Sequence, residues 1–598
     1  SDAGTAIFNH DIKLGDGGIA IFGASSDLQI LHDGSDSIIA DSGDGSLLLR
    51  GASQVRLQGI DQSNMLIGNQ GGSIHLYHNN QEKLATSSTG IDVTGTAVTD
   101  GLTVAGNVSV DGGTIKLDGS YPTGTNNVAL GNTAGDSLQS GGNYNTLIGD
   151  NAGTALTTGD QNTALGFNAL QTEDTGSRST AIGAYTLVNQ NNDDLNYNTA
   201  VGYSALNAAT TGIYNTAIGG QSLNANTTGA SNVAIGLNSL LSNTTGASNV
   251  AIGTLALDAN TTASYNTAIG QSALSANTTG TPNTAVGYQS LLSNTTGTNN
   301  TALGSESLEV NTTGANNVAV GSITLDANTT GSNNVAVGYA SLTENTTGDL
   351  NTAVGQGALT ANTTGVSNDA FGALALDANT TGGFNVAIGR SALSANTTAS
   401  VNTAVGHAAL AANTTGTENT ALGANALDAN TEGDNNTALG RDALGQNTTA
   451  DENTGVGANS LFSNTTGTAN TALGFGSLSS NVSADNNTAI GKQALKTNTG
   501  AVNTAVGSTA LYSNTTGVAN TAVGRQALYA NETANFNNAF GAEALATNTT
   551  GASNVAVGYG TLTTNTTASN NTAVGHLALT ANTTGAKNVA VGALSLDA

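Results

Sequence analysis

Apolar and polar residues recur along most of this chain with a period of 17 residues. The segment Asn-Thr-Ala-Val-Gly returns, with small variations, in 28 copies between Asn127 and Asn588. From Asn198 to Asn487 the spacing is an unbroken 17, while earlier spacings are 17 to 19 and one of 16 precedes Asn503. Such a repeat predicts a solenoid, in which each coil packs mainly against its two neighbours.

The positions of the repeat, numbered one to seventeen from this Asn, read Asn-Thr/Val-Ala-Val/Ile/Leu-Gly-x-x-Ala/Ser-Leu-x-Ala/Ser-Asn-Thr-Thr-Gly-x-x. Position five is Gly in every copy, so we expect a corner whose backbone needs φ > 0 or has a close neighbour. Position four is always Val, Ile, Leu or Phe, and position nine is Leu in all but the first two copies. We expect these two positions to form the apolar interior. The marker residues of the repeat are Ala200, Val201, Gly202, Leu206, Gly287 and Gly440.

The Asn-Thr-Thr-Gly segment at positions twelve to fifteen, as at 226–229, has the residues of a second corner, because Asn and Gly tolerate left-handed geometry. We expect this corner at the surface. A helical solenoid is disfavoured, since Thr, Asn and Gly fill each repeat and helical repeats usually need about 33 residues. The fold class is therefore all-β, a parallel β-solenoid. At about 4.8 Å per stacked strand, 28 coils give a rod of about 135 Å.

The first 120 residues follow a different pattern. Short alternating pairs, typical of strands with one buried face, are separated by Asp-Gly turns at 33–34, 44–45, 100–101 and 111–113. The pairs are Leu28 and Ile30, Val55 and Leu57, Leu102 and Val104, Val108 and Val110, and Ile115 and Leu117. We therefore predict two domains, a β-rich shaft segment over 1–120 and the solenoid over 121–598, joined near residues 120–124.

Composition and charge exclude several classes of protein. Charged residues make up only 9% of the chain and Gly numbers 79, which disfavours both a globular domain with a thick core and a disordered tail. The net charge of −28 would repel nucleic acid and anionic membranes. Cysteine is absent and no apolar run reaches the length of a membrane span. We expect no nucleic-acid partner and no membrane insertion.

A single coil is expected to be too thin to stand alone. Ordering 17 residues costs about 25 kcal/mol at about 1.5 kcal/mol per residue, while each buried aliphatic side chain returns only about 1.5–3 kcal/mol. Hydrogen bonds between coils and Asn ladders help, and another buried face would help most. The small residue at position three, as at Ala200, Ala217 and Ala234, would let another chain approach closely. We therefore expect a homotrimer; the alternative is that this Ala fits a narrow solenoid interior.

Two features resemble known families. The stretches 28–35 and 83–95, LQILHDGS and KLATSSTGIDVTG, resemble segments of marine-phage tail fibres. The Asn-Thr-Ala-Val-Gly array is similar to arrays in phage fibres that end in a self-cleaving intramolecular chaperone. More distantly it is similar to the head repeats of trimeric autotransporter adhesins, although their repeat is shorter. The adhesin resemblance implies a left-handed parallel β-roll within a trimer.

No catalytic residue is nominated, and we expect a protein that is not an enzyme and has no cofactor. The six histidines are scattered; His75 and His78 are candidate metal ligands if three chains bring them to one axis, or else polar shaft residues. His407 and His576 share position six, which we expect to face solvent. Calcium is an alternative role for Asp residues that otherwise form Gly-rich turns, namely Asp33, Asp36, Asp41, Asp44, Asp111 and Asp118. The Asn-x-Thr triplets at position twelve are glycosylation acceptors only in a eukaryotic secretory product.

Tyrosines at position six are candidates for stacking on sugars or for packing on the fibre wall: Tyr203, Tyr288, Tyr339 and Tyr559. The function expected is that of a phage tail fibre, located on the virion tail or cell surface. It would contact other tail proteins and project a tip, outside this sequence, towards a host glycan receptor. A bacterial adhesin or polymerising extracellular filament is the alternative. A third possibility is an ice or polysaccharide binder that uses the Thr-Thr ladder at positions thirteen and fourteen.

Overall fold

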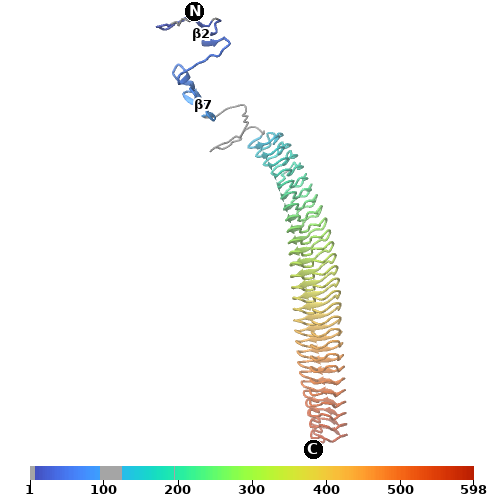
Figure 1. Ribbon diagram of the computed structural model, residues 1–598. Coiled ribbons are helices and arrows are strands. Elements are labelled where there is room, and N and C mark those ends of the chain that lie inside the picture. The colour runs from blue at the N-terminus through green and yellow to red at the C-terminus, as the bar shows by residue number, and fades with distance from the viewer. Residues whose placement is uncertain (1–6, 24, 95–123, 194, 598) are drawn as a thin grey trace. The chain divides into compact units, whose positions relative to one another are not determined.

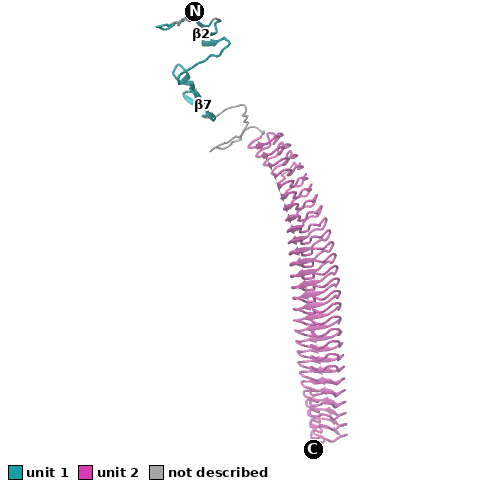
Figure 2. Cartoon of the chain, in the orientation of Figure 1, with its two compact units in different colours: residues 1–115 teal, residues 116–598 magenta. Residues whose placement is uncertain are grey.

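A computed structural model describes residues 7–23, 25–94, 124–193 and 195–597. The chain divides into two compact units, residues 1–115 and 116–598 (Figure 2). The expected join near 120–124 lies almost wholly outside the described residues, as do the predicted strand pairs between Leu102 and Leu117. We describe each unit by itself.

Unit 1 consists of two antiparallel sheets. The first contains β1 (Ile19–Phe22), β2 (Leu28–His32) and β3 (Ser37–Asp41). The second contains β4 (Gln54–Gln58), β5 (Asn64–Asn69), β6 (Ile74–His78), β7 (Gln81–Ser87) and β8 (Gly90–Val93), each paired with the next. The strands expected around Leu28 and Val55 are confirmed, and the turn at 33–34 joins β2 to β3.

The described part of unit 1 buries very little of its apolar surface. Its buried hydrophobic residues are Ile67, 7% exposed, and Ala85, 8% exposed. Phe22, Ile60 and Ile91 are more than half exposed. A single sheet needs a second layer against its apolar face to be stable in water. The described residues of unit 1 do not provide that layer.

Unit 2 is a stack of three-residue strands, one in each coil (Figure 1). Each strand pairs in parallel with the strand of the next coil, one repeat apart, so that Thr199 lies opposite Thr216 and Ala200 opposite Ala217. The predicted parallel β-solenoid is therefore confirmed. Its described strands are β9 (Val128–Leu130), β10 (Thr146–Ile148), β11 (Thr163–Leu165), β12 (Thr180–Ile182), β13 (Thr199–Val201), β14 (Thr216–Ile218), β15 (Val233–Ile235), β16 (Val250–Ile252), β17 (Thr267–Ile269), β18 (Thr284–Val286), β19 (Thr301–Leu303), β20 (Val318–Val320), β21 (Val335–Val337), β22 (Thr352–Val354), β23 (Asp369–Phe371), β24 (Val386–Ile388), β25 (Thr403–Val405), β26 (Thr420–Leu422), β27 (Thr437–Leu439), β28 (Thr454–Val456), β29 (Thr471–Leu473), β30 (Thr488–Ile490), β31 (Thr504–Val506), β32 (Thr521–Val523), β33 (Asn538–Phe540), β34 (Val555–Val557), β35 (Thr572–Val574) and β36 (Val589–Val591).

The interior of the solenoid is formed by positions three, eight and nine; position eight is Ala or Ser in most coils, and Ala205 there is fully buried. Ala200 and Leu206 are fully buried, and the same holds along the stack. The expectation that position four lies inside is wrong: Val201 is only half-buried and faces outward. Neighbouring residues of a strand point to opposite faces, so once position three points inward, positions two and four point outward.

The role expected for the alanine at position three is also wrong. Ala200, Ala217 and Ala234 have no exposed surface, because they pack inside their own coils. The alternative is confirmed: this small side chain fits a narrow interior opposite Leu at position nine. A partner chain therefore cannot reach these alanines, and any oligomer must use another surface.

Position five is the corner that the invariant glycine predicts. Its φ is +130° at Gly202, +144° at Gly287 and +138° at Gly440. A Cβ at Gly202 would lie 2.6 Å from the carbonyl carbon of Gly219 in the next coil. Both reasons for glycine therefore apply, the positive φ and the close approach of a neighbouring backbone.

Leu at position nine adopts a left-handed conformation, with φ of +50° at Leu206 and similar values along the stack. This conformation costs about 1–2 kcal/mol in an L-residue. Burial of the leucine returns about 1.5–3 kcal/mol, and its N–H donates to the carbonyl of Ser222 in the next coil at 3.0 Å. The leucine therefore remains favourable at a strained position.

Asparagine at position twelve is buried, which corrects the expectation that the Asn-Thr-Thr-Gly corner lies at the surface. Asn243 is fully buried; its Nδ2 donates to Oδ1 of Asn226 in the preceding coil at 2.8 Å and to the carbonyl of Gly246 at 3.0 Å. These bonds recur from coil to coil, and we call the column the Asn spine (position twelve from Asn226 to Asn582). Gly229 lacks a positive φ, but a Cβ there would lie 2.4 Å from Gly246 O. Glycine is needed for close packing rather than for left-handed geometry.

A second ladder runs along position one. The backbone N–H of Asn232 donates to Oδ1 of Asn215 at 3.0 Å, and Asn232 Nδ2 donates to the carbonyl of Gly246 at 2.9 Å. Backbone bonds between coils also occur outside the strands, as from Thr227 N to Thr244 O at 2.9 Å. Hydrogen bonds thus join neighbouring coils around most of their circumference, which compensates for the small apolar interior.

Candidate interaction surfaces

The outward side of the strand ladder is a continuous surface, which we call the sheet face (positions two and four of β9–β36). Position two is mostly Thr or Val, and position four is Val, Ile, Leu or Phe in all copies. Leu303 and Leu422 are each 45% exposed, and Ile388 is 43% exposed. Position four therefore forms an uncharged aliphatic column along the stack. Contiguous apolar surface of this kind marks interaction sites.

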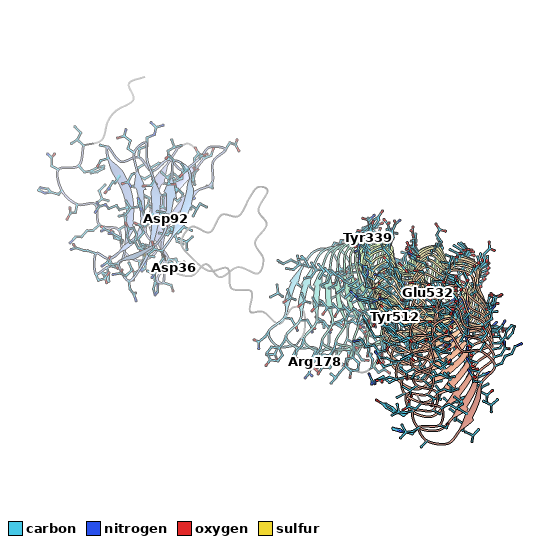
Figure 3. All side chains as sticks on the ribbon, turned by 90° about the horizontal axis from the view of Figure 1, so that it is seen from below. Asp36, Asp92, Arg178, Tyr339, Tyr512 and Glu532 are labelled. Carbon is cyan, nitrogen blue, oxygen red and sulfur yellow. The ribbon has the colours of Figure 1, made fainter. Side chains whose placement is uncertain are left out.

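Charged residues of the solenoid lie almost entirely on its other edges. Asp369 is a charged residue at position two of a strand, whereas Asp and Glu recur at positions seven, ten, sixteen and seventeen. Long side chains project outward around the stack (Figure 3). The charge distribution thus separates a sheet face, on which Asp369 is the one charged residue in β9–β36, from acidic edges.

The threonine columns differ in how their hydroxyls are used. Thr227 Oγ1 at position thirteen donates to the carbonyl of Thr244 in the next coil at 3.0 Å, and this bond recurs along the stack. Thr228 at position fourteen is exposed. Because the position-thirteen hydroxyls donate to backbone carbonyls, only the position-fourteen threonines present a column of exposed hydroxyls, and this column lies at a corner of the coil.

The position-six residues are exposed, as expected. Tyr203 is 58% exposed and Tyr339 is 57% exposed (Figure 3); Tyr288 and Tyr559 are 44% and 48% exposed. His407 and His576 are exposed as well. Tyr559 stacks on His576 of the next coil, with ring centroids 5.6 Å apart. Side chains that lie one repeat apart in the sequence therefore contact each other. The other aromatic contacts described below follow the same rule.

Sequence reasoning missed two ladders in which a cation precedes two tyrosines in successive coils. Lys496 lies 5.2 Å from the ring centre of Tyr512, which stacks on Tyr529 at 5.3 Å and 16°. Reading position ten at the 17-residue spacing would have found this ladder.

The second ladder lies at position seventeen. Arg178 lies 5.3 Å from the ring centre of Tyr197, and Nη1 of Arg178 donates to the hydroxyl of Tyr197. Tyr197 in turn stacks on Tyr214 at 5.7 Å. Cation–π contacts of this kind contribute about 0.5–1 kcal/mol when exposed.

His75 and His78 do not converge within one chain. Exposure alternates along β6, with His75 half-buried and His78 exposed, so the two rings lie on opposite faces of the strand. His75 Nδ1 lies 2.8 Å from Glu82 Oε2, and its other nitrogen contacts the hydroxyl of Ser73. Within the described residues no group of three or more His, Asp or Glu side chains is placed to hold a metal ion.

Of the candidate calcium-binding aspartates that are described, Asp36 and Asp44 are exposed, and the other two accept hydrogen bonds within their own turns. Oδ1 of Asp33 accepts the N–H groups of Asp36 and Ser35 at 2.8 and 2.9 Å, and these bonds lower the pKa of Asp33. Asp41 Oδ1 similarly accepts Gly43 N–H at 3.1 Å. Asp111 and Asp118 lie outside the described residues.

One carboxyl is fully buried in the solenoid. Glu173 replaces Asn at position twelve, where the spacing of the next coil lengthens to 19. Its oxygens accept Gly176 N–H at 2.8 Å, Gln190 Nε2 at 2.9 Å and Asn196 Nδ2 at 3.0 Å. Burial raises the pKa of Glu173 despite these bonds. The carboxyl holds the inserted residues against the stack.

Comparison with known proteins gave no match to a family model, to a curated protein or to a solved structure. In the part of the chain that is described, no helix is long and apolar enough to cross a membrane.

Proposed function

We propose that this chain is the shaft of a tail fibre, a homotrimeric rod on a phage virion that carries a receptor-binding end away from its anchor. The role is mechanical rather than enzymatic. Several such rods on one particle would multiply weak contacts with a host surface glycan through a high effective concentration. The observation that carries the proposal is the uninterrupted sheet face of β9–β36, together with the thin sheets of unit 1.

The solenoid has the mechanics that a spacer requires. Twenty-eight strands at about 4.8 Å give a length of about 135 Å, and hydrogen bonds join each coil to the next around most of its circumference. A rod built in this way resists bending better than a flexible linker of the same length. Its function is then to hold the receptor-binding end at a distance from the anchor.

The occupant that best fits the sheet face is another copy of this chain. Position four is apolar in every coil, and a partner must present matching side chains at the same spacing over the whole stack. An identical chain meets that requirement because it has the same repeat and the same spacing. Three copies around one axis bring three narrow aliphatic columns together, with each column in contact with the other two.

Unit 1 supports the same assembly independently. Its described sheets expose Phe22, Ile60 and Ile91, and leave only Ile67 and Ala85 buried. Three chains winding together would provide the missing layer for each sheet. The net charge of −28 favours separation of neighbouring fibres in solution and disfavours nucleic acid as a partner.

The test is the mass of the native particle by light scattering, with rod length from negative-stain images of the same sample. We expect three times 58.6 kDa and a slender rod. A monomer would refute the trimer. Filaments of unlimited length would instead support the alternative, an extracellular filament or adhesin subunit that polymerises.

Charge placed on the sheet face provides a sharper test. Leu422→Asp with Leu439→Asp should dissociate the trimer, because six carboxylates would be buried without partners. The matched control is Thr415→Asp with Thr449→Asp at exposed position fourteen, where Glu432 shows that a carboxylate is accepted. Circular dichroism should show intact coils in both variants, and a trimer that survives Leu422→Asp with Leu439→Asp would place the interface elsewhere.

A further inference from the structure

The distribution of positive charge along the solenoid is uneven. Residues 179–389 contain ten Asp or Glu and no Lys or Arg, although they span more than 200 positions. Residues 486–596 contain four Lys or Arg and only two Glu. Asp485 and Asp597 flank these residues, so the segment is close to neutral, and in a chain with a net charge of −28 it is the part of the solenoid that repels an anion least.

The cations of this segment are interleaved with aromatic rings. Lys492 and Arg525 occupy position six, and Lys496 occupies position ten of the same coil as Lys492. Tyr512 and Tyr529 continue the column of Lys496 through the next two coils. Lys492 and Arg525 are exposed, whereas Lys496 and both tyrosines are half-buried. We call Lys492, Lys496, Tyr512, Arg525 and Tyr529 the basic-aromatic patch.

Positions six, seven and ten belong to one surface of the stack. The hydroxyl of Thr563, at position ten, donates to the carbonyl of Glu543, at position seven of the preceding coil, at 3.3 Å. Arg525, at position six, forms an ion pair with Glu543. The members of the basic-aromatic patch therefore face the same solvent region, on an edge that is distinct from the sheet face.

The two lysines have few internal partners. Lys496 Nζ donates to the hydroxyl of Tyr512 at 3.1 Å, a neutral acceptor, while Arg525 is already paired with Glu543. An incoming anion can therefore replace water on Lys492 and Lys496 without breaking an ion pair. Charge-assisted hydrogen bonds of this kind are stronger than neutral ones.

We infer that the basic-aromatic patch binds a saccharide chain carrying carboxylate or sulfate groups, laid along the rod. The coil of Lys496 and the coil of Arg525 are two steps apart, about 10 Å at the spacing of stacked strands, a span comparable with a disaccharide. Tyr512 lies in the coil between them and Tyr529 in the coil of Arg525, and both offer hydroxyls and apolar ring edges to sugar. The shaft would thus bind acidic glycan along its side, independently of any tip.

Two other sites are weaker candidates for the same chemistry. Arg178, Tyr197 and Tyr214 form a similar ladder, but Glu173, Asp174 and Asp193 make that region acidic. Arg390 and Arg441 share position six with Lys492, yet position ten of their coils holds Ser394 and Gly445 instead of an aromatic ring. The combination of local positive charge and stacked rings is found at the basic-aromatic patch.

The experiment is calorimetric titration of the full chain with three hexasaccharides: a heparin fragment, an oligogalacturonate and neutral maltohexaose. We expect at least one acidic probe to bind about tenfold or more tightly than maltohexaose, and its affinity to fall as salt is raised to about 1 M, where the Debye length is about 3 Å. Equal affinity for the neutral probe, or no binding of either acidic probe, would overturn the inference.

Variants locate the site. Lys492→Gln with Lys496→Gln should lower the affinity for the acidic probe about tenfold or more, and Tyr529→Ala should lower that affinity less. The matched control, Arg390→Gln with Arg441→Gln, also removes two positive charges, both of them from position six. It should leave the affinity for the acidic probe unchanged. An unaffected lysine variant, or a control that weakens binding equally, would refute the patch. Circular dichroism confirms that each variant retains its coils.

Discussion

Unit 1 and unit 2 differ in how they bury their apolar side chains. In the described part of unit 1, single-layer sheets leave most Ile, Leu and Phe side chains in solvent, and only Ile67 and Ala85 are buried. In unit 2 most coils enclose an Ala and a Leu, and the half-exposed aliphatic residues of the strands form one column at position four. A β-chain can thus be stable by closing on itself coil by coil, or it can depend on other chains. In this protein unit 2 closes on itself, whereas the described part of unit 1 does not.

Separating the two units should give the largest effect. We expect residues 116–598 alone to retain parallel β-structure and a cooperative thermal transition, because the core lies within the coils. Residues 1–115 alone, diluted below any assembly concentration, should show no cooperative transition, since nothing covers their apolar faces. Circular dichroism and light scattering over a concentration series measure this. A monomeric 1–115 with a cooperative transition would contradict the comparison.

Within unit 2, the two apolar columns should respond differently to truncation. Leu342→Ala removes a fully buried side chain and should destabilise its coils by about 2–5 kcal/mol. Val337→Ala, on the sheet face of the same coil, should cost the isolated coils less than about 1 kcal/mol and weaken oligomerisation instead. Denaturation and native mass are measured on both variants. Equal destabilisation by the two changes would show that position four belongs to the core after all.

The Asn spine is the polar counterpart of the leucine column, and unit 1 has no equivalent in its described residues. Asn345 Nδ2 donates to Asn328 Oδ1 at 2.9 Å, and Asn345 Oδ1 accepts Asn362 Nδ2 at 2.8 Å. Asn345→Ala leaves both neighbours short of one bond in a buried site, so we expect a loss of about 1–3 kcal/mol. The exposed control Thr347→Ala, at position fourteen of the same coil, should change stability by less than about 0.5 kcal/mol. Hydrogen exchange of the flanking coils measures both changes.

The smallest expected effect is the pH response at Glu173. Burial raises the pKa of Glu173 in the folded chain above its value in the unfolded chain, so the folded state binds the proton more tightly. The contribution of this group to stability is therefore fully present below the unfolded pKa and is lost as pH rises through the folded one. The unfolding temperature of the first solenoid coils, measured with a probe near residue 178, should fall as the pH rises through the folded pKa of Glu173. Glu173→Gln should flatten the shift, and an unchanged shift in that variant would assign it to another group.

The sequence alone predicted the repeat, the parallel stacking, the corner at Gly202 and the burial of Leu206, because a 17-residue period with an invariant Gly and Leu restricts the chain to short stacked strands. It also separated the first 120 residues from the rest, and it predicted the exposure of position six. It did not decide which of Ala200 and Val201 faces inward. Alternation fixes only that the two face opposite ways.

The tertiary structure decided those remaining points. Packing opposite Leu at position nine leaves space for Ala but not for Val, which turns the aliphatic column outward and makes the sheet face. The sequence predicts a surface corner at Asn226, yet this side chain is buried. Its Nδ2 donates to the carbonyl of Gly229 in its own coil, and its Oδ1 accepts from Nδ2 of Asn243 in the next coil. Lys496, Tyr512 and Tyr529 are 16 and 17 residues apart in the sequence and become neighbours only when the coils stack. Local pattern determines the coil, whereas the contacts between coils determine which of its residues are core and which are surface.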